Sequence, residues 1–480
     1  MSESKRNKRK ERYKVKIFPV PIAVKEIKED TTVNTNIPSK NSKKEILNQA
    51  FKFHSEGKIS EAEKYYKYLI KEGYKDPRVF CNYGAICKQH GKLEQALYLF
   101  KQSTKFFPKN ADLHLNLGTI LKELGKLSEA EIATRKAIEI NQLDADSHYN
   151  LGNIMKDLGK LQEAEISIRK AIEINPNLAV AHLNLGNIYI ELGKLEDAEI
   201  SLYKAIKLNP NSPEPRNNIA AIFRDLGKLK QAEISVRKAI QMKPNFAKAH
   251  NNLGLVLKDL RKLQEAEISF KRAIEIEPNY AEAYSNMALI LKDLNKLNEA
   301  EICLQKAIKI KPDYAEAIFN LSFIELLKGK YQTGLEKYEF RLKIKNHLII
   351  NCKSKLKRRD SKKLTKSEKL LLICEQGLGD TLQYMRYIPY LRDHDGVDVS
   401  LCAQEKLHSL IKASAIDLNP LTPEETNQVS EGSWLPLLSL PRLLKVNPKN
   451  PIVSKPYIFS TDELNKKWKK ILSKETRPIV

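Results

Sequence analysis

The chain has 480 residues, of which 42% are hydrophobic and 30% are charged, and its formal net charge is +24. This length leaves room for more than one domain, and the apolar content supports packed cores, which excludes a chain that is disordered throughout. The positive charge by itself suggests an acidic partner, nucleic acid or an anionic membrane surface.

Much of the positive charge is concentrated in two short stretches. Residues 1–16 carry a net charge of +6 and residues 353–369 carry +7, so these stretches hold 13 of the 24 charges. The part between them is only mildly basic. We therefore interpret both stretches as solvated segments of a Lys-rich chain, and nucleic-acid binding is the less favoured alternative.

The cysteines and the hydropathy indicate where the protein resides. There is no Cys-x-x-Cys pair among the six cysteines, which are Cys81, Cys87, Cys303, Cys352, Cys374 and Cys402. This spacing predicts free thiols in a reducing compartment. No apolar run approaches the roughly 18–20 residues that span a bilayer. We expect a cytoplasmic protein with no transmembrane segment, no metal site and no cofactor.

Residues 1–42 are basic and then polar, and they lack helical periodicity, which predicts a disordered tail. From residue 43 to residue 346, small residues return at three fixed offsets every 34 residues. The first offset is Gly84, Gly118, Gly152, Gly186, Ala220, Gly254 and Ala288, the second is Gly57, Gly91, Gly125, Gly159, Gly193 and Gly227, and the third is Ala96, Ala130, Ala164, Ala198, Ala232, Ala266 and Ala300. Self-similarity at this period predicts an α-solenoid of two-helix units.

Each unit is predicted to hold an A helix, such as residues 111–124, and a B helix, such as residues 127–140. A Gly such as Gly125 ends the A helix in the left-handed conformation, and a Pro such as Pro108 stops the B helix of the preceding unit. The other small residues lie where the two helices cross. This pattern resembles the tetratricopeptide repeat over about nine units, residues 43–346. The resemblance implies a right-handed superhelix whose A helices line a concave face.

Two late units depart from the pattern at the end of the A helix, where Arg261 and Asn295 replace the usual Gly. Asn adopts the left-handed conformation tolerably, whereas Arg would be strained there.

Every unit carries Asn two residues before the small residue of its A helix. These residues are Asn48, Asn82, Asn116, Asn150, Asn184, Asn218, Asn252, Asn286 and Asn320. Asn forms helices only moderately well, because its side chain competes with the backbone for hydrogen bonds. A row of primary amides along the groove would match the N–H and C=O groups of an extended peptide, whatever its sequence. The alternative is that these side chains only brace adjacent A helices.

A second row follows six positions later, with Lys or Arg in six units and an acidic neighbour after most of them. The row consists of Lys88, Lys122, Lys156, Arg224, Lys258 and Lys292. It predicts either a charge-balanced groove edge or solvated helix ends. A carboxylate clamp for chaperone C-termini is disfavoured: Lys44 and Lys248 fit its first requirement, but Asp112 and Glu316 stand where positive charge is needed.

After a basic linker, residues 347–366, the periodicity changes. Residues 369–374 and 397–401 read as buried strands, and residues 382–392 and 405–413 as helices, which predicts a parallel sheet. The loop between the first strand and the first helix contains Gly377, Gly379, Asp380 and Thr381. A Gly-x-Gly loop lets the backbone approach a ligand, but Asp380 could equally be a helix cap.

Three motifs in this region resemble bacterial repeat-bearing glycosyltransferases, which have a GT-B fold related to heptosyltransferases and are similar to O-GlcNAc transferase. The motifs are Tyr338-Glu-Phe-Arg341, Glu375-Gln-Gly-Leu-Gly-Asp-Thr381 and Trp434-Leu-Pro-Leu-Leu-Ser-Leu-Pro441. The resemblance implies that Asp380 is the acceptor-side catalytic base and that Gly377, Gly379 and Thr381 form a substrate-binding loop. The Asn row likewise resembles the asparagine ladder of O-GlcNAc transferase.

The resemblance implies two Rossmann-like halves, yet residues 367–480 have room for one. Residues 477–480 resemble the start of the donor-binding half. We therefore predict a tetratricopeptide-repeat solenoid followed by a partial α/β Rossmann-like half-domain, acting as a scaffold that binds extended protein segments. The alternative is a glycosyltransferase acting on proteins, or its acceptor-binding half, which uses a nucleotide sugar only if the missing half is supplied.

Overall fold

The computed structural model describes residues 42–344, 354–359, 364–375, 377–393, 395–452 and 456–472. Apart from Ser42, the predicted tail lies outside these residues, as does much of the predicted linker. The chain divides into two compact units, residues 1–244 and 245–480, and each is described by itself.

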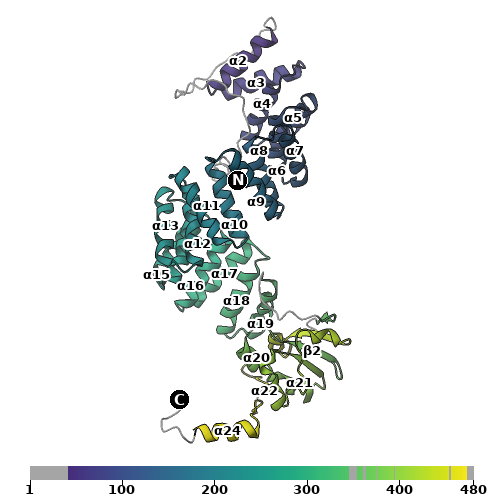
Figure 1. The fold of residues 1–480 in the computed structure, drawn as a ribbon. Helices are drawn as coiled ribbons and strands as arrows, with labels where there is room; N and C mark the ends of the chain where they lie inside the picture. The colour runs from purple at the N-terminus through teal and green to yellow at the C-terminus, as the bar shows by residue number, and fades with distance from the viewer. Residues whose placement is uncertain are drawn as a thin grey trace. The chain divides into compact units, whose positions relative to one another are not determined.

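Unit 1 consists of six helix pairs, in which even-numbered helices are A helices and odd-numbered helices are B helices (Figure 1). The pairs are α2 (Lys43–Ser55) with α3 (Ile59–Lys71), α4 (Pro77–Gln89) with α5 (Leu93–Phe106), α6 (Ala111–Glu123) with α7 (Leu127–Ile140), α8 (Ala145–Asp157) with α9 (Leu161–Ile174), α10 (Ala179–Glu191) with α11 (Leu195–Leu208), and α12 (Pro213–Asp225) with α13 (Leu229–Met242).

The turn inside each pair follows from its Gly. Gly125 has φ of 76°. Its N–H donates to the Lys122 carbonyl at 3.0 Å, and the Lys126 N–H donates to the Leu121 carbonyl at 2.9 Å. This is a Schellman motif, which satisfies the last carbonyls of α6 and reverses the chain.

The small residue of each A helix lies against the B helix of its own pair, as the sequence predicts. A Cβ at Gly118 would lie 2.2 Å from Thr134 Oγ1, and one at Gly152 would lie 2.6 Å from Ile168. Such distances are too short for a side chain, so Gly sets how closely the two helices approach.

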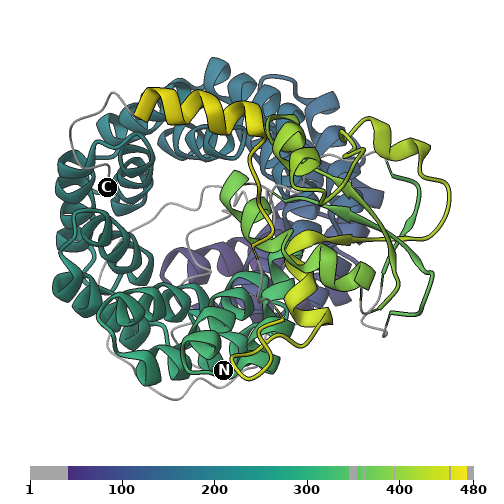
Figure 2. The same cartoon turned by 90° about the horizontal axis from the view of Figure 1, so that it is seen from below.

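Unit 2 begins with three further pairs and continues into an α/β part (Figure 2). The pairs are α14 (Ala247–Asp259) with α15 (Leu263–Ile276), α16 (Ala281–Asp293) with α17 (Leu297–Ile310), and α18 (Ala315–Leu327) with α19 (Tyr331–Tyr338), after which η1 (Glu339–Lys343) follows. Arg261 and Asn295 have φ of 61° and 60°, so both adopt the left-handed conformation predicted for them.

The α/β part has four strands and several short helices. The strands are β1 (Lys357–Arg358), β2 (Lys369–Ile373), β3 (Asp398–Cys402) and β4 (Ser433–Pro436); the helices are α20 (Leu378–Tyr384), α21 (Tyr387–Asp393), η2 (Glu405–Leu407), α22 (His408–Ala413), η3 (Glu425–Gln428), η4 (Leu437–Ser439), α23 (Leu440–Leu443) and α24 (Asp462–Leu472). The strands form one parallel sheet in the order β1-β4-β2-β3. The parallel sheet expected from the sequence is therefore present.

Two details differ from the sequence-based expectation. The predicted helix 382–392 begins earlier, at Leu378, and is interrupted between Tyr384 and Tyr387. Pro389 lies just after the interruption, and it has no backbone N–H to bond back across it. The predicted linker 347–366 contains β1, because Lys357 and Arg358 pair with Ser433 and Trp434.

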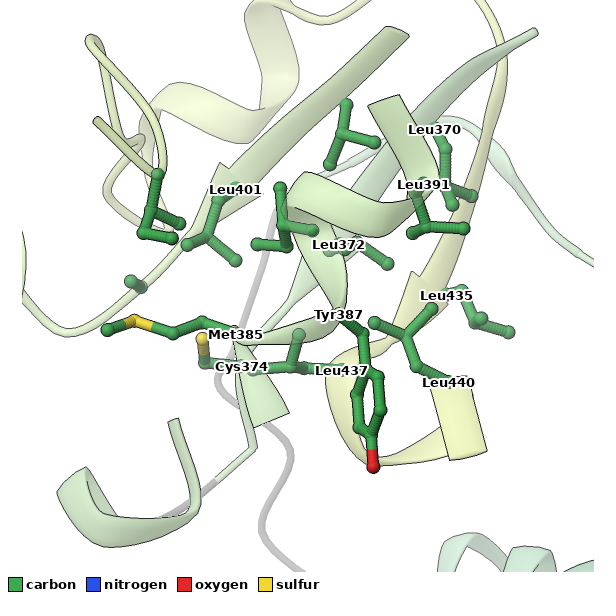
Figure 3. Close-up of a cluster of buried hydrophobic side chains, with 14 of the residues drawn as sticks. Leu370, Leu372, Cys374, Met385, Tyr387, Leu391, Leu401, Leu435, Leu437 and Leu440 are labelled. Atoms are coloured by element: carbon green, nitrogen blue, oxygen red, sulfur yellow. The ribbon is translucent and has the colours of Figure 1, made fainter. Parts of the chain in front are cut away.

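The larger core cluster of the α/β part lies on one face of the sheet, between β2, β3 and the helices that follow them, and a smaller cluster with Leu371, Ile373 and Cys402 lies on the other face. Figure 3 shows Leu370, Leu372 and Leu401 from the strands facing Tyr387 and Leu391 from α21. Tyr338 of the last repeat also packs against this cluster. No helix of the described residues is long and apolar enough to cross a membrane.

Candidate functional site

The Asn row of unit 1 differs in exposure from one end to the other. Asn48 is exposed, whereas Asn82, Asn116 and Asn150 are buried. The Nδ2 of Asn116 donates to Cys81 Sγ at 3.5 Å, and that of Asn150 donates to Thr119 Oγ1 at 3.4 Å. Cys81 and Thr119 lie on the preceding A helices. These buried amides therefore connect neighbouring A helices, which is the bracing alternative.

Asn184 and Asn218 are only half-buried. Asn184 Nδ2 donates to Asn153 Oδ1 at 2.7 Å and to Tyr149 Oη at 3.0 Å, and Asn218 Nδ2 donates to Asn187 Oδ1 at 2.6 Å. We call the five side chains that lie along α8, α10 and α12 the amide cluster: Asn153, Asn184, Asn187, Asn217 and Asn218.

The amide cluster leaves two half-buried polar atoms without a hydrogen-bond partner among the described residues. These are the Oδ1 of Asn184, which acts only as a donor, and the Nδ2 of Asn187, which acts only as an acceptor. The two residues are three apart on α10 and so lie one turn apart on the same face. One acceptor and one donor are thus available side by side.

The sequence singled out Asn184 but not Asn187. Asn153 and Asn187 do recur at one 34-residue interval, three residues after the row, and that recurrence was the available signal.

In unit 2, the same bracing geometry recurs. Asn286 Nδ2 donates to Asn251 Oδ1 at 3.0 Å, and Asn320 Nδ2 donates to Ser285 Oγ at 3.4 Å. Both acceptors lie on the preceding A helix, and both donors are half-buried together with Asn252.

The second row forms ion pairs between consecutive A helices in unit 1. Lys88 pairs with Glu123 at 2.9 Å, Lys122 with Asp157 at 2.9 Å, and Lys156 with Glu191 at 3.0 Å. Burial lowers the pKa of Lys88, against the opposing attraction of Glu123. These cations are neutralised by their neighbours, so this edge is charge-balanced, one of the two expectations.

The first turns of the A helices in unit 1 carry charges of both signs. Asp112, Asp146 and Glu214 occupy the second position of α6, α8 and α12, whereas Lys44 and Arg78 occupy that position in α2 and α4. Glu214 pairs with Lys243 at 3.4 Å.

The Gly377 loop of unit 2 lies at the carboxyl end of β2. Gly377 has φ of 97°, which favours Gly. Asp380 is exposed, and a Cβ at Gly377 would lie 2.8 Å from its Oδ2. Thr381 is buried, and its Oγ1 donates to Gln404 Oε1 at 2.9 Å. A Cβ at Gly379 would have no other atom within 4 Å, apart from those of its own helix. The loop thus presents Asp380 to solvent, while Thr381 holds the loop in place.

The three motifs that carry the glycosyltransferase resemblance meet at one buried charge. Arg341 is fully buried, and its guanidinium donates to Glu375 through Nε at 2.8 Å and Nη2 at 2.5 Å. Nη2 also donates to Ser439 Oγ at 3.1 Å. Burial by itself would lower the pKa of Arg341, but the hydrogen bonds to Glu375 outweigh it and raise the pKa above the ordinary value. We call Arg341, Glu375, Glu339 and Ser439 the anchor cluster.

Three cations of the second basic stretch form ion pairs. Arg358 contacts Glu339 at 3.1 Å, Arg359 pairs with Glu368, and Lys369 contacts Glu431 at 2.6 Å. The first basic stretch lies outside the described residues. The five described cysteines are buried, and none of them forms a disulfide.

Models of the tetratricopeptide repeat match residues 88–154, 145–178, 179–212, 213–246, 247–280 and 281–314. Residues 88–314 form a tetratricopeptide-repeat array. No curated protein matches the sequence.

Several solved repeat structures are similar to this array. A chain of the APC/C hetero-tetramer Cut9–Hcn1 is 17% identical with a TM-score of 0.46; the match covers 58% of this chain and 55% of that one. A tetratricopeptide-repeat protein of Parabacteroides merdae is 20% identical, with a TM-score of 0.43 and coverage of 52% and 98%. YrrB, described as a repeat protein with an unusual peptide-binding site, is 26% identical, with a TM-score of 0.31 and coverage of 39% and 96%. The chain thus spans about half the length of the Cut9–Hcn1 chain.

Proposed function

We propose that this protein is an interaction scaffold whose A-helix face in unit 1 binds an extended peptide segment at the amide cluster. The observation that supports this most directly is the unpaired acceptor and donor of Asn184 and Asn187. A peptide unit offers one N–H and one C=O, and an amide acceptor and donor one helical turn apart can satisfy both.

In unit 1, this proposal assigns peptide binding to one member of the predicted row of nine asparagines, Asn184, together with Asn187. The buried members, Asn82, Asn116 and Asn150, would act by bracing the A helices. The members in unit 2, Asn252, Asn286 and Asn320, would offer a separate face of the same kind.

The five cysteines that the structure describes are buried and form no disulfide, which fits the reducing cytoplasm that we propose as the location.

Selection of random peptides displayed on phage against the purified chain tests the proposal. A recovered peptide is labelled and titrated by fluorescence anisotropy. Replacing both Asn184 and Asn187 with Ala should weaken its binding about ten-fold or more, because two hydrogen bonds of about 0.5–1.5 kcal/mol each are lost. Asn211→Ala, at an exposed position just before α12, is the control. Equal affinity for all three proteins would reject the site.

The second candidate is the acceptor-binding half of a glycosyltransferase, with Asp380 as the base. It is favoured by the exposed carboxylate of Asp380 behind Gly377 at the carboxyl end of β2, where parallel sheets bind ligands. The test is turnover of nucleotide sugars by the purified chain with a protein acceptor. Turnover that survives Asp380→Asn would remove the assigned role, and absence of turnover would leave the scaffold function alone.

A further inference from the structure

The outer surface of the B helices in unit 1 carries a regular row of exposed apolar side chains. One such residue occupies the sixth position of five consecutive B helices, and its exposure ranges from 59% to 71%. The residues are Tyr98, Ile132, Ile166, Ile200 and Ile234. Single exposed apolar residues are ordinary, but a row at one position of every repeat is a continuous surface feature.

The row arises from the order of two neighbouring residues. In four of these helices a Glu precedes the Ile, and the Glu rather than the Ile turns inward. Glu131 contacts Arg135 at 2.9 Å and Lys160 of the next repeat at 3.4 Å, while Glu165 contacts Lys194 at 2.9 Å. Hydrogen bonds to these cations lower the pKa of Glu131 and Glu165 against the opposing effect of burial. The inward carboxylate thus links repeats, and the isoleucine is left outside.

The surface around the central isoleucines has no net charge, although the chain as a whole carries +24. On α7, α9 and α11, the outward positions beside the Ile hold equal numbers of acidic and basic residues: Glu129, Glu139, Arg135 and Lys136; Glu163, Glu173, Arg169 and Lys170; and Glu196, Asp197, Lys204 and Lys207. Two copies of a strongly basic chain repel each other, so a neutral apolar surface is where they can approach.

We propose that a second copy of this chain docks on the row formed by Ile132, Ile166 and Ile200, through its own identical row. A two-fold axis that runs along the row makes the contact isologous, so each isoleucine faces the same isoleucine of the other copy. The spacing of the two rows matches because both come from the same repeat.

Charge complementarity supports this orientation. The two-fold axis makes α9 antiparallel to the α9 of the other copy. Glu163, near the helix N-terminus, then lies opposite the Lys170 of the other copy, near its C-terminus. A parallel arrangement would instead place like charges opposite each other.

A hollow beside Ile132 provides room for the opposing side chain. It has a volume of about 560 Å³ and is lined by Leu117, Leu121 and Ala133 together with Ile132. In the proposed dimer, the Ile132 of the other copy enters it.

Sedimentation equilibrium of the full chain tests the proposal. Wild type should behave as a dimer at micromolar concentration, and the triple variant Ile132→Glu, Ile166→Glu, Ile200→Glu should be a monomer, with dimer affinity reduced at least a hundred-fold. All three residues are exposed, so circular dichroism should show unchanged helix content. Leu143→Glu is the matched control, since Leu143 is 76% exposed but lies in a turn outside the row. A monomeric wild type, or a triple variant that remains dimeric, overturns the proposal.

Cysteine cross-linking tests the two-fold axis. Under a mild oxidant, Ile166→Cys should form a disulfide-linked dimer by itself. Ile132→Cys and Ile200→Cys should each form one by itself as well, and no disulfide should join the two variants to each other when they are mixed. Cross-linking of Leu143→Cys to the same extent, or of Ile132→Cys to Ile200→Cys, would contradict the assigned geometry.

Discussion

Arg261 and Asn295 both adopt the left-handed backbone conformation, although their side chains differ. Both have φ near 60°, and most other repeats place Gly there. The left-handed conformation costs an L-residue roughly 1–2 kcal/mol, but Asn is one of the few residues that visit it routinely. The strain therefore falls on Arg261.

Replacing Arg261 with Gly should stabilise α14 and α15. The substitution removes the strain of the left-handed conformation, but Gly also increases the conformational entropy of the unfolded chain. We therefore expect the free energy of unfolding to rise by a net amount of about 0.5–1 kcal/mol. Asn295→Gly is the matched control and should change little. Hydrogen exchange of the amides in α14–α17 measures both effects. An equal gain in the two variants would show that the strain at Arg261 is absent.

At the scale of the helix pair, the contact between the small residue of the A helix and the B helix decides the geometry. Gly152 faces Ile168 in α9, whereas the equivalent pair in α12 and α13 is Ala220 with Val236. Where the A helix has the smaller residue, Gly, the B helix has the larger Ile. Where the A helix has the larger Ala, the B helix has the smaller Val.

Gly152→Ala should destabilise unit 1 by about 1–3 kcal/mol, because its Cβ would lie 2.6 Å from Ile168. Adding Ile168→Val reproduces the Ala220–Val236 combination and should recover part of the loss. Urea denaturation followed by circular dichroism measures the cycle. If the two changes are simply additive, the contact is not the cause.

The first two repeats contain a hydrogen-bonded chain that responds to pH. Asn82 Nδ2 donates to Tyr66 Oη at 3.3 Å, which lies 3.1 Å from His54 Nδ1. Burial lowers the pKa of His54 below 6.5, and burial raises that of Tyr66 to about 12. A neutral His54 can accept from the Tyr66 hydroxyl, whereas a protonated one cannot.

Acid should therefore loosen α2 and α3. The unfolded chain binds a proton at His54 near pH 6.5 while the folded chain does so only at lower pH, so stability is full above 6.5 and falls as the pH drops below it. Hydrogen exchange in α2 and α3, corrected for the intrinsic pH effect, should show this loss. It should be absent in His54→Gln; the same loss in that variant would assign it to another group.

The accuracy of the sequence-based predictions varies between elements for physical reasons. The residues that set a helix pair lie within one 34-residue unit, and α7 begins and ends where it was predicted to. β1 was missed because it has only two residues and pairs with residues of β4 that lie 76 positions further along the chain. The burial of Asn116 and Asn150 depends on Cys81 and Thr119 of preceding repeats, which the periodic pattern does not specify. The pairing of Arg341 with Glu375 could likewise not be predicted from the sequence, because it depends on how the last repeat packs against the sheet.

At the largest scale, the last repeat and the sheet of unit 2 contribute to one hydrophobic core. Tyr338 packs against the apolar core of the sheet, and Arg341 reaches Glu375 at the end of β2 and Ser439 of η4. We infer that the α/β part folds together with α18, α19 and η1.

Removing one partner of the Arg341–Glu375 pair should destabilise the α/β part strongly. Arg341→Met removes the cation that pairs with the buried carboxylate of Glu375, at a cost of about 3–5 kcal/mol, and adding Glu375→Met should recover most of it. Lys369→Met removes an exposed pair with Glu431 in the same part and should change its stability little. The two tryptophans of the chain, Trp434 and Trp468, both lie after residue 346, so fluorescence during urea denaturation reports on this part. If unit 2 instead comprised two independent domains, Arg341→Met would leave this transition unchanged.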